Sequence, residues 1–227
     1  MPELPEVETV KKGLEDFIVN KTIKKIYLSG FSLRFPIPDN FVSLILEKKI
    51  LSIGRRAKYL LFNLSDNITI ISHLGMSGSY KVLSSEESKD YTPKKHDHVI
   101  FEFVNFKVVY NDPRRFGYIF VTEKDPKEHK LIKSLGPEPM SNKFNENALA
   151  EKFYKKDRPI KNALLDQTII SGLGNIYVCE ALFRSNINPK KKIKQLVYSN
   201  KSPKNSLVLL ANKFNEVIRE SISLGGS

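Results

Sequence analysis

Eight short runs rich in β-branched and aromatic residues, all between residues 21 and 124, most constrain how this chain can fold. Turn-forming stretches such as SDN separate them, and short strands at this spacing favour an antiparallel sandwich. An amphipathic helix is predicted at 5–19, with Pro5 in its first turn. We therefore predict an N-terminal β-sandwich opened by a helix. The eight runs read TIKKIYLSG, KKILSIG, KYLLFNL, ITIISHL, SYKVLS, HVIFEFVN, KVVYN and GYIFVTE.

The pattern changes after Glu123, where polar residues lead into LGPEPMSN, a stretch with one glycine and two prolines. Beyond it, apolar residues recur at helical spacing, and Ser202 is the predicted N-cap of the last helix. We predict an α+β protein with a sandwich domain at 1–130, a linker at 131–142 and an all-helical domain at 143–227. The predicted helices are 145–156, 160–166, 175–185 and 203–223.

Charge points to the class of partner. Lys and Arg number 37 against 25 Asp and Glu, giving a net charge of +12 and a pI near 9.6, which is typical of proteins that bind a polyanion. Nucleic acid is favoured over an anionic membrane surface, and an RNA-binding protein would explain the charge equally well. No run approaches the roughly 20 apolar residues of a membrane span, and no signal peptide is present, so we predict a cytoplasmic location.

The single cysteine, Cys179, excludes an intrachain disulfide and a four-cysteine zinc site within these residues. It lies in an apolar run, where a buried and inert thiol is expected. His96 and His98 in KKHDHV would share one face of a strand, but no third metal ligand is evident. With lysines beside them, we predict that His98 lies on an edge that contacts DNA phosphate, and we predict no metal site.

The N-terminal stretch MPELPEVETV carries a candidate nucleophile. Removal of Met1 would expose the secondary amine of Pro2, and an α-amino group has a pKa near ~7.7–8.0, so part of it is unprotonated at neutral pH. Such an amine forms a Schiff base with an aldehyde-level carbon, and the product is a charged iminium. Glu3 would be the adjacent acid. The alternative is that Pro2 is an arbitrary second residue.

Three loops between the strands carry residues suited to DNA. Lys58 in GRRAKYLLF lies between basic residues and a strand, and a solvated lysine at a strand edge is the alternative to a functional role. Met76 lies between glycines in SHLGMSG, where an exposed apolar side chain can act as a wedge between bases. In NDPRRFG, Arg114 can pair with a base edge and Phe116 can stack in a gap, unless the segment is only a structural turn.

The segment SGLGN would join two short helices in the second domain. Its two glycines permit sharp turns, and Asn175 is the predicted cap of the following helix, whose N-terminal amides would suit a phosphate. An ordinary helical hairpin with an asparagine cap is the alternative.

Taken in order, PELPEVET, RRAKYL, HLGMSG, KHDHV, NDPRRFG, LGPEPM and GLGNIYVCEALF resemble the bacterial formamidopyrimidine-DNA glycosylase family. The match runs from Pro2 to Gly226, and the leucine of PELPE favours this family over its sister, endonuclease VIII. The resemblance implies a monomeric, nucleoid-associated base-excision-repair enzyme, a DNA glycosylase and AP lyase that removes 8-oxoguanine and formamidopyrimidines from double-stranded DNA. A catalytically impaired DNA-binding fragment or an endonuclease VIII-like glycosylase is the alternative.

The resemblance also implies roles for individual residues. Pro2 would attack C1′ of a flipped nucleotide, Glu3 would protonate the sugar ring oxygen, and β,δ-elimination would release both phosphates. Lys58 would bind phosphates around the lesion, with His73 at the floor of the site, and Glu6 would lie near the lesion. Three further residues would fill the hole left by the extruded base, and two in the helix–two-turn–helix would grip the backbone. The residues that would fill the hole are Met76, Arg114 and Phe116. Those that would grip the backbone are Lys161 and Asn175.

The C-terminal end departs from the family pattern. Family members normally continue past the LGG near Gly225 into a lesion-capping loop and a four-cysteine zinc finger, whereas this sequence ends at Ser227. We expect a fragment of a longer protein. The resemblance therefore implies no cofactor for these residues, because the family's structural zinc would need the finger.

Overall fold

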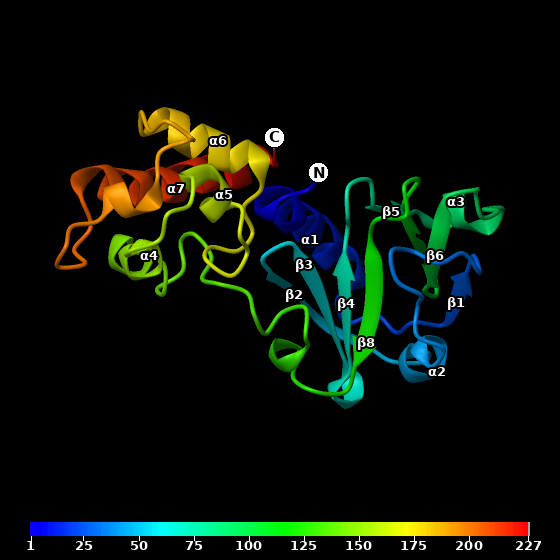
Figure 1. Ribbon diagram of the computed structural model, residues 1–227. Helices are drawn as coiled ribbons and strands as arrows, with labels where there is room; N and C mark the ends of the chain where they lie inside the picture. Colours follow the sequence, from blue (N-terminus) through cyan, green and yellow to red (C-terminus); the bar gives the residue numbers. More distant parts are fainter. Residues whose placement is uncertain (227) are drawn as a thin grey trace. The chain divides into compact units, whose positions relative to one another are not determined.

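The computed structural model describes residues 1–226, which divide into two compact units (Figure 1). The first comprises Met1–Pro2 and Val7–Ile132; the second comprises Glu3–Glu6 and the chain from Lys133 onward. Helix α1 (Leu4–Ile18) therefore begins in the second unit and continues in the first. In the described part of the chain, no helix is both long and apolar enough to cross a membrane.

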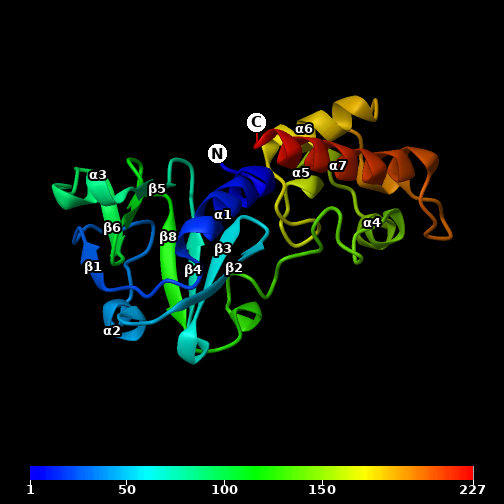
Figure 2. The same ribbon diagram turned by 180° about the vertical axis from the view of Figure 1, so that it is seen from behind.

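The first unit contains two four-stranded antiparallel sheets, with strand orders β1-β6-β7-β5 and β2-β3-β4-β8 (Figures 1 and 2). Each of the eight predicted runs holds one strand, so the predicted antiparallel sandwich and the α+β class are confirmed. The strands are β1 Lys25–Leu28, β2 Ile50–Arg56, β3 Tyr59–Leu64, β4 Thr69–His73, β5 Ser79–Leu83, β6 Asp97–Glu102, β7 Lys107–Asn111 and β8 Tyr118–Thr122.

Alternating side chains from both sheets form the core of this unit. Leu60 and Phe62 of β3 and Phe101 of β6 are buried in one apolar cluster, which also contains Val7 and Leu14 of α1. This follows from the period of two in strands and of 3.6 in a helix, which places the apolar residues of each element on one face. The remaining elements of this unit are the short helices α2 (Phe41–Ile45) and α3 (Ser85–Lys89) and the 3₁₀ turns at Ser65–Asn67 and Pro126–Glu128.

The second unit is helical around a separate apolar core that includes Phe153, Leu164, Val178 and Phe214. The predicted helical segments are found, with ends that differ from the prediction by up to three residues. They are α4 Glu146–Phe153, α5 Ile160–Leu164, α6 Asn175–Arg184 and α7 Asn205–Leu224, with a 3₁₀ turn at Ile193–Leu196.

The predicted cap of the last helix is wrong. Helix α7 begins at Asn205 with Lys204 as N-cap, and the Ser202 hydroxyl instead donates to Asn200 Oδ1, 2.7 Å away. An antiparallel bridge between Val197 and Pro203 keeps the chain extended past the predicted start, which delays the helix by two residues.

Candidate nucleic-acid interface

Lys58 lies in the two-residue turn between β2 and β3, directly after Ala57, whose φ is +52°. Only 7% of its surface is exposed. The alternative that Lys58 is a solvated edge lysine is therefore wrong, because a lysine is rarely buried to this extent without a charged or polar role. Its charge contributes to lowering the pKa of the His73 ring.

His73 ends strand β4 and is held by both backbone and ring contacts. Its Nδ1 accepts a hydrogen bond from the Gly75 N–H at 2.9 Å, and its ring stacks on Tyr118 with centroids 4.8 Å apart. Burial, and after it the charges of Lys58 and Arg34, together lower the pKa of His73 to about 4. The ring is therefore neutral at pH 7, and its Nε2 carries the proton as a donor.

We expect His73 to make stability depend on pH. The unfolded chain takes up this proton near pH 6.5 but the folded chain only near pH 4, so stability is complete above pH 6.5 and falls as the pH drops toward 4. The full loss would be about 3 kcal/mol. Denaturant unfolding at pH 7 and pH 4.5 should show this fall in the unaltered protein and in His96→Gln, which retains His73, but a smaller fall in His73→Gln. An equal fall in all three would contradict it.

A cavity of about 820 Å³ opens in the first unit, beside His73. Met76, Arg114 and Phe116, predicted to fill the gap in DNA, all line it, and so does Met1. Met76 and Phe116 are 42% and 44% exposed, although both are apolar. The Arg114 guanidinium lies 4.9 Å from the centre of the Phe116 ring, so a cation and an aromatic face are presented together.

Two residues that shape this cavity, Arg34 and Asp112, were not predicted from the sequence. Arg34 lines it from the segment before α2, and its N–H donates to the Gly117 carbonyl at 3.0 Å. Asp112 is fully buried and accepts hydrogen bonds from the Gly117 N–H at 2.8 Å and from the Ser77 hydroxyl at 2.5 Å. Asp112 therefore ties the Met76 loop to the Phe116 loop. A basic residue between aromatics in FSLRFP could have suggested Arg34.

We expect Phe116→Ala to weaken binding to a lesion-containing duplex by about ten-fold or more, since base stacking on an aromatic ring contributes about 1–3 kcal/mol. The melting temperature should hardly change, because the ring is largely exposed. Phe17→Ala is the matched control, since Phe17 is 52% exposed in the same unit but lies outside this cavity. Fluorescence anisotropy and thermal melting measure the two effects. A stability loss above about 3 kcal/mol would identify Phe116 as a core residue instead.

The predicted phosphate contact of His98 is wrong. His98 is 1% exposed; its Nε2 donates to the Asp112 carbonyl at 3.0 Å, and its Nδ1 lies 3.0 Å from Ser29 Oγ. A register shift between Asp97 and Val99 interrupts the alternation of side chains, which turns His98 inward. His96, just before the strand, remains half-buried at the surface.

Glu3 occupies the N-terminus of helix α6 in the second unit. It is 2% exposed, and its two carboxylate oxygens accept the N–H groups of Gly174 at 2.5 Å and Ile176 at 3.0 Å. A carboxylate is stabilised there by the orphan amides and the helix dipole. Two predictions are corrected: Gly174, not Asn175, is the N-cap, and these two amides bind Glu3 rather than a phosphate. Asn175 is the first helical residue, and its side chain is exposed.

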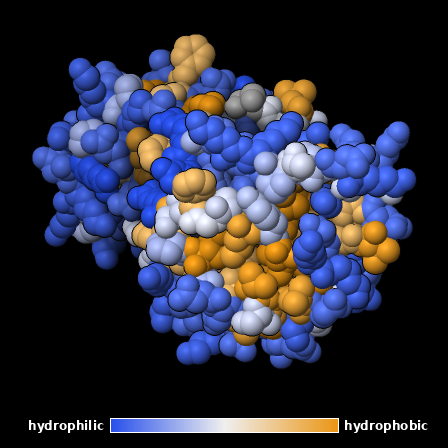
Figure 3. Space-filling view, turned by 90° about the vertical axis from the view of Figure 1, so that its right-hand side faces the viewer, coloured by the Kyte–Doolittle hydropathy of each residue, from blue (hydrophilic) through white to orange (hydrophobic). Residues whose placement is uncertain are grey.

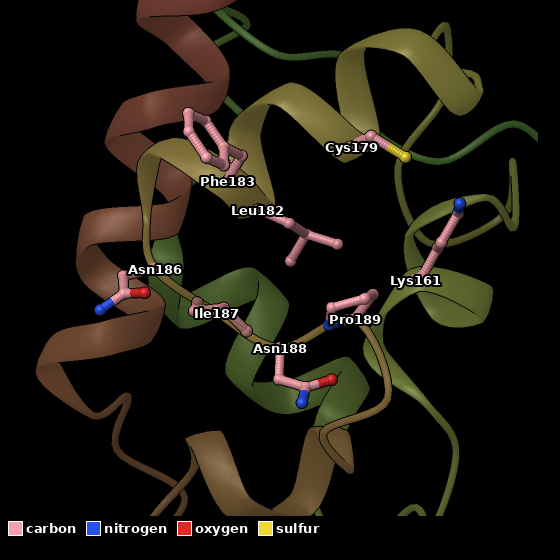
Figure 4. Close-up of a pocket in the computed structure, with 8 residues that line it drawn as sticks. All are labelled: Lys161, Cys179, Leu182, Phe183, Asn186, Ile187, Asn188 and Pro189. Carbon is pink, nitrogen blue, oxygen red and sulfur yellow. The ribbon is translucent and has the colours of Figure 1, made fainter.

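A second cavity, of about 550 Å³, lies in the helical unit, where Lys161 of α5 and Cys179 of α6 line it together (Figure 4). Cys179 is half-exposed, so the prediction of a buried thiol is wrong. Its position on α6 places it on the face turned toward this cavity rather than toward the core. Phe183, one turn further along α6, is 81% exposed.

The surface of the first unit also has an apolar face. Figure 3 shows apolar side chains gathered there among hydrophilic ones, on the side where β1 and α3 lie.

Among residues 1–226, no three or more His, Cys, Asp or Glu side chains are grouped so that they could hold a metal ion.

Comparisons with known proteins agree with this geometry. Residues 1–119 match the family model of the formamidopyrimidine-DNA glycosylase N-terminal domain, and residues 135–227 match the model of its H2TH domain. The chain is 44% identical to the formamidopyrimidine-DNA glycosylase of Agrobacterium fabrum, a match that covers 100% of this chain and 81% of that protein.

Solved structures of proteins bound to damaged DNA are also similar to this chain. One is the Lactococcus lactis formamidopyrimidine-DNA glycosylase bound non-covalently to DNA containing an AP site, with 37% identity and a TM-score of 0.87 over 99% of this chain and 83% of that one. Another is a variant of the Lactococcus lactis protein with DNA containing Fapy-dG, with 38% identity and a TM-score of 0.88 over 100% and 80%.

Proposed function

Since the chain belongs to the formamidopyrimidine-DNA glycosylase family, a family of DNA-repair enzymes, we propose that it removes oxidised purines from duplex DNA through a Schiff base on Pro2. The substrates would be 8-oxoguanine and formamidopyrimidines. The same Schiff base would give it AP lyase activity. Double-stranded DNA that carries the lesion would be its partner.

The observation that carries this proposal is that Met1 lines the same cavity as Met76, Arg114 and Phe116. Removal of Met1 would leave the nitrogen of Pro2 as the chain end beside that cavity. Flipping a nucleotide costs a few kcal/mol of stacking and pairing, which an inserted wedge and arginine offset. Removal of Met1 would thus bring a nucleophile and a wedge to one place, as base excision requires.

The chemistry would proceed in three steps. The Pro2 nitrogen forms a bond to C1′ of the flipped nucleotide, and the bond from C1′ to the base breaks. The base leaves with the bonding electrons and takes a proton from water. Glu3 takes up the proton that the Pro2 amine loses and passes it to the sugar ring oxygen as the ring opens, which leaves a charged iminium; a carboxylate has about four lone-pair sites, so the two α6 amides leave room for this proton. The iminium acidifies the 2′ hydrogen, and the 3′ and then the 5′ phosphate leave by elimination.

The remaining residues would bind the DNA backbone. Buried Lys58, with neutral His73 near it, would contact phosphates around the lesion. In the second unit, Lys161 and the exposed side chain of Asn175 would contact phosphates through charge and hydrogen bonds. The net charge of +12 supports such a footprint.

The test is incubation with a duplex containing one 8-oxoguanine, in the presence of borohydride, which reduces an iminium to a stable adduct. We expect a covalent protein–DNA adduct, with the DNA on Pro2 by peptide mapping, and no adduct on an undamaged duplex. Tight binding to the lesion without any adduct would indicate a binding module and contradict the proposal.

A further inference from the structure

We propose that Tyr177 is a positioning residue for the Pro2 nucleophile, an inference that rests on the function proposed above. Tyr177 belongs to the first turn of α6 and is 3% exposed. Its hydroxyl contacts two side chains that lie far from it in sequence, Glu6 of α1 and Ser221 of α7.

The two hydrogen bonds of the Tyr177 hydroxyl run in one direction, from Ser221 through Tyr177 to Glu6. The Tyr177 hydroxyl donates to Glu6 Oε1 at 2.5 Å, so it has no further proton to give, and the Ser221 hydroxyl, 2.5 Å away, must be the donor toward Tyr177. The chain of donors therefore ends on the Glu6 carboxylate. Bonds that end on an ionised group are the stronger kind, and a chain of them reinforces each member.

The other oxygen of Glu6 fixes the backbone beside the nucleophile. Glu6 Oε2 accepts the N–H of Glu3 at 2.8 Å. That nitrogen belongs to the peptide bond between Pro2 and Glu3, and a peptide bond is planar. Glu6 therefore sets the orientation of the peptide plane that carries Pro2. The Glu3 side chain is fixed separately by the amides of α6.

The carboxylate of Glu6 has little room to adopt another position. A Cβ atom placed on Gly226 would lie 3.1 Å from Glu6 Oε1, so the backbone closely approaches this oxygen on one side while Tyr177 bonds to it. Loss of the Tyr177 hydroxyl would leave this oxygen without that donor. The carboxylate could then rotate, and the Pro2–Glu3 peptide would lose its fixed orientation.

Tyr177→Phe removes the hydroxyl and keeps the ring. With a duplex that contains a preformed abasic site, we expect borohydride trapping under single-turnover conditions to be about ten-fold slower, because small errors of position strongly reduce the rate of an oriented attack. The dissociation constant for a duplex with an uncleavable tetrahydrofuran site should change by less than about two-fold, as no DNA ligand is removed.

The matched control is Tyr154→Phe, since the Tyr154 hydroxyl donates to the Ser199 carbonyl at 3.2 Å in the same unit. Borohydride trapping by Tyr154→Phe should proceed at the rate of the unaltered protein. If Tyr177→Phe does not fold, Ser221→Ala, which removes only the donor to Tyr177, should slow trapping by about three-fold. An unchanged rate in the folded variant overturns the role of Tyr177. If the unaltered protein forms no adduct, the proposed function fails as well.

Discussion

Pro2→Gly is expected to reduce AP lyase activity by roughly a hundred-fold or more, since it alters the nucleophile itself. Proline gives an iminium that carries a permanent charge, whereas a glycine amine gives an imine that must first be protonated before it withdraws electrons. Glycine also lacks the ring that fixes φ, so its amine samples more directions. Strand cleavage of a duplex with an abasic site, followed on a denaturing gel, measures the effect.

Mass spectrometry, a control variant and mapping of the adduct together test whether Pro2 is the nucleophile. Mass spectrometry of the unaltered protein should show loss of Met1, without which the Pro2 nitrogen is an amide and cannot react. Pro38→Gly, which changes a proline far along the chain, should retain activity. Reduced adduct mapped to Lys58 rather than to Pro2 would show that the nucleophile is wrongly assigned.

Local chemistry explains what the sequence could predict. The eight strands were predicted because alternation and turn residues are properties of short segments. Lys58, Met76 and Phe116 were predicted because a lysine among basic residues before a strand, a methionine between glycines and an aromatic in an arginine-rich turn are unusual where they stand. Helices α2 and α3 were not predicted, because each spans little more than one turn and lies among the strand runs; α5 is equally short but was expected within a longer helical segment.

Contacts between distant segments explain which parts of the site could not be predicted from the sequence. His98 was misplaced because its partner Ser29 lies 69 residues away and a register shift turns it inward. The role of Glu3 at the start of α6 depends on Gly174, 171 residues further along. Tyr177 is likewise 171 residues from Glu6, and nothing in the local sequence of either shows that they meet. The parts of the site that join distant segments therefore needed the structure.

Gly75→Ala is expected to destabilise the protein by about 3–5 kcal/mol, combining backbone strain with a steric clash. Gly75 has a φ of +62°, where an L side chain is strained, and a Cβ there would lie 2.3 Å from the carbonyl carbon of Phe116 and 2.4 Å from the nitrogen of Gly117. Both are backbone atoms, which Asp112 holds in place through the Gly117 N–H. The Met76 loop and the Phe116 loop would have to separate.

Gly13→Ala is the matched control, because Gly13 lies in helix α1 and a Cβ there would meet nothing within 4 Å. It should be stabilising by about 0.5–1 kcal/mol, the usual gain when alanine replaces glycine inside a helix. Denaturant unfolding gives both values, and anisotropy with a lesion duplex should show weaker binding for Gly75→Ala at a temperature where it is still folded. A Gly75→Ala protein with unaltered stability and unaltered lesion binding would mean that the close approach of these two loops is not required for wedge insertion.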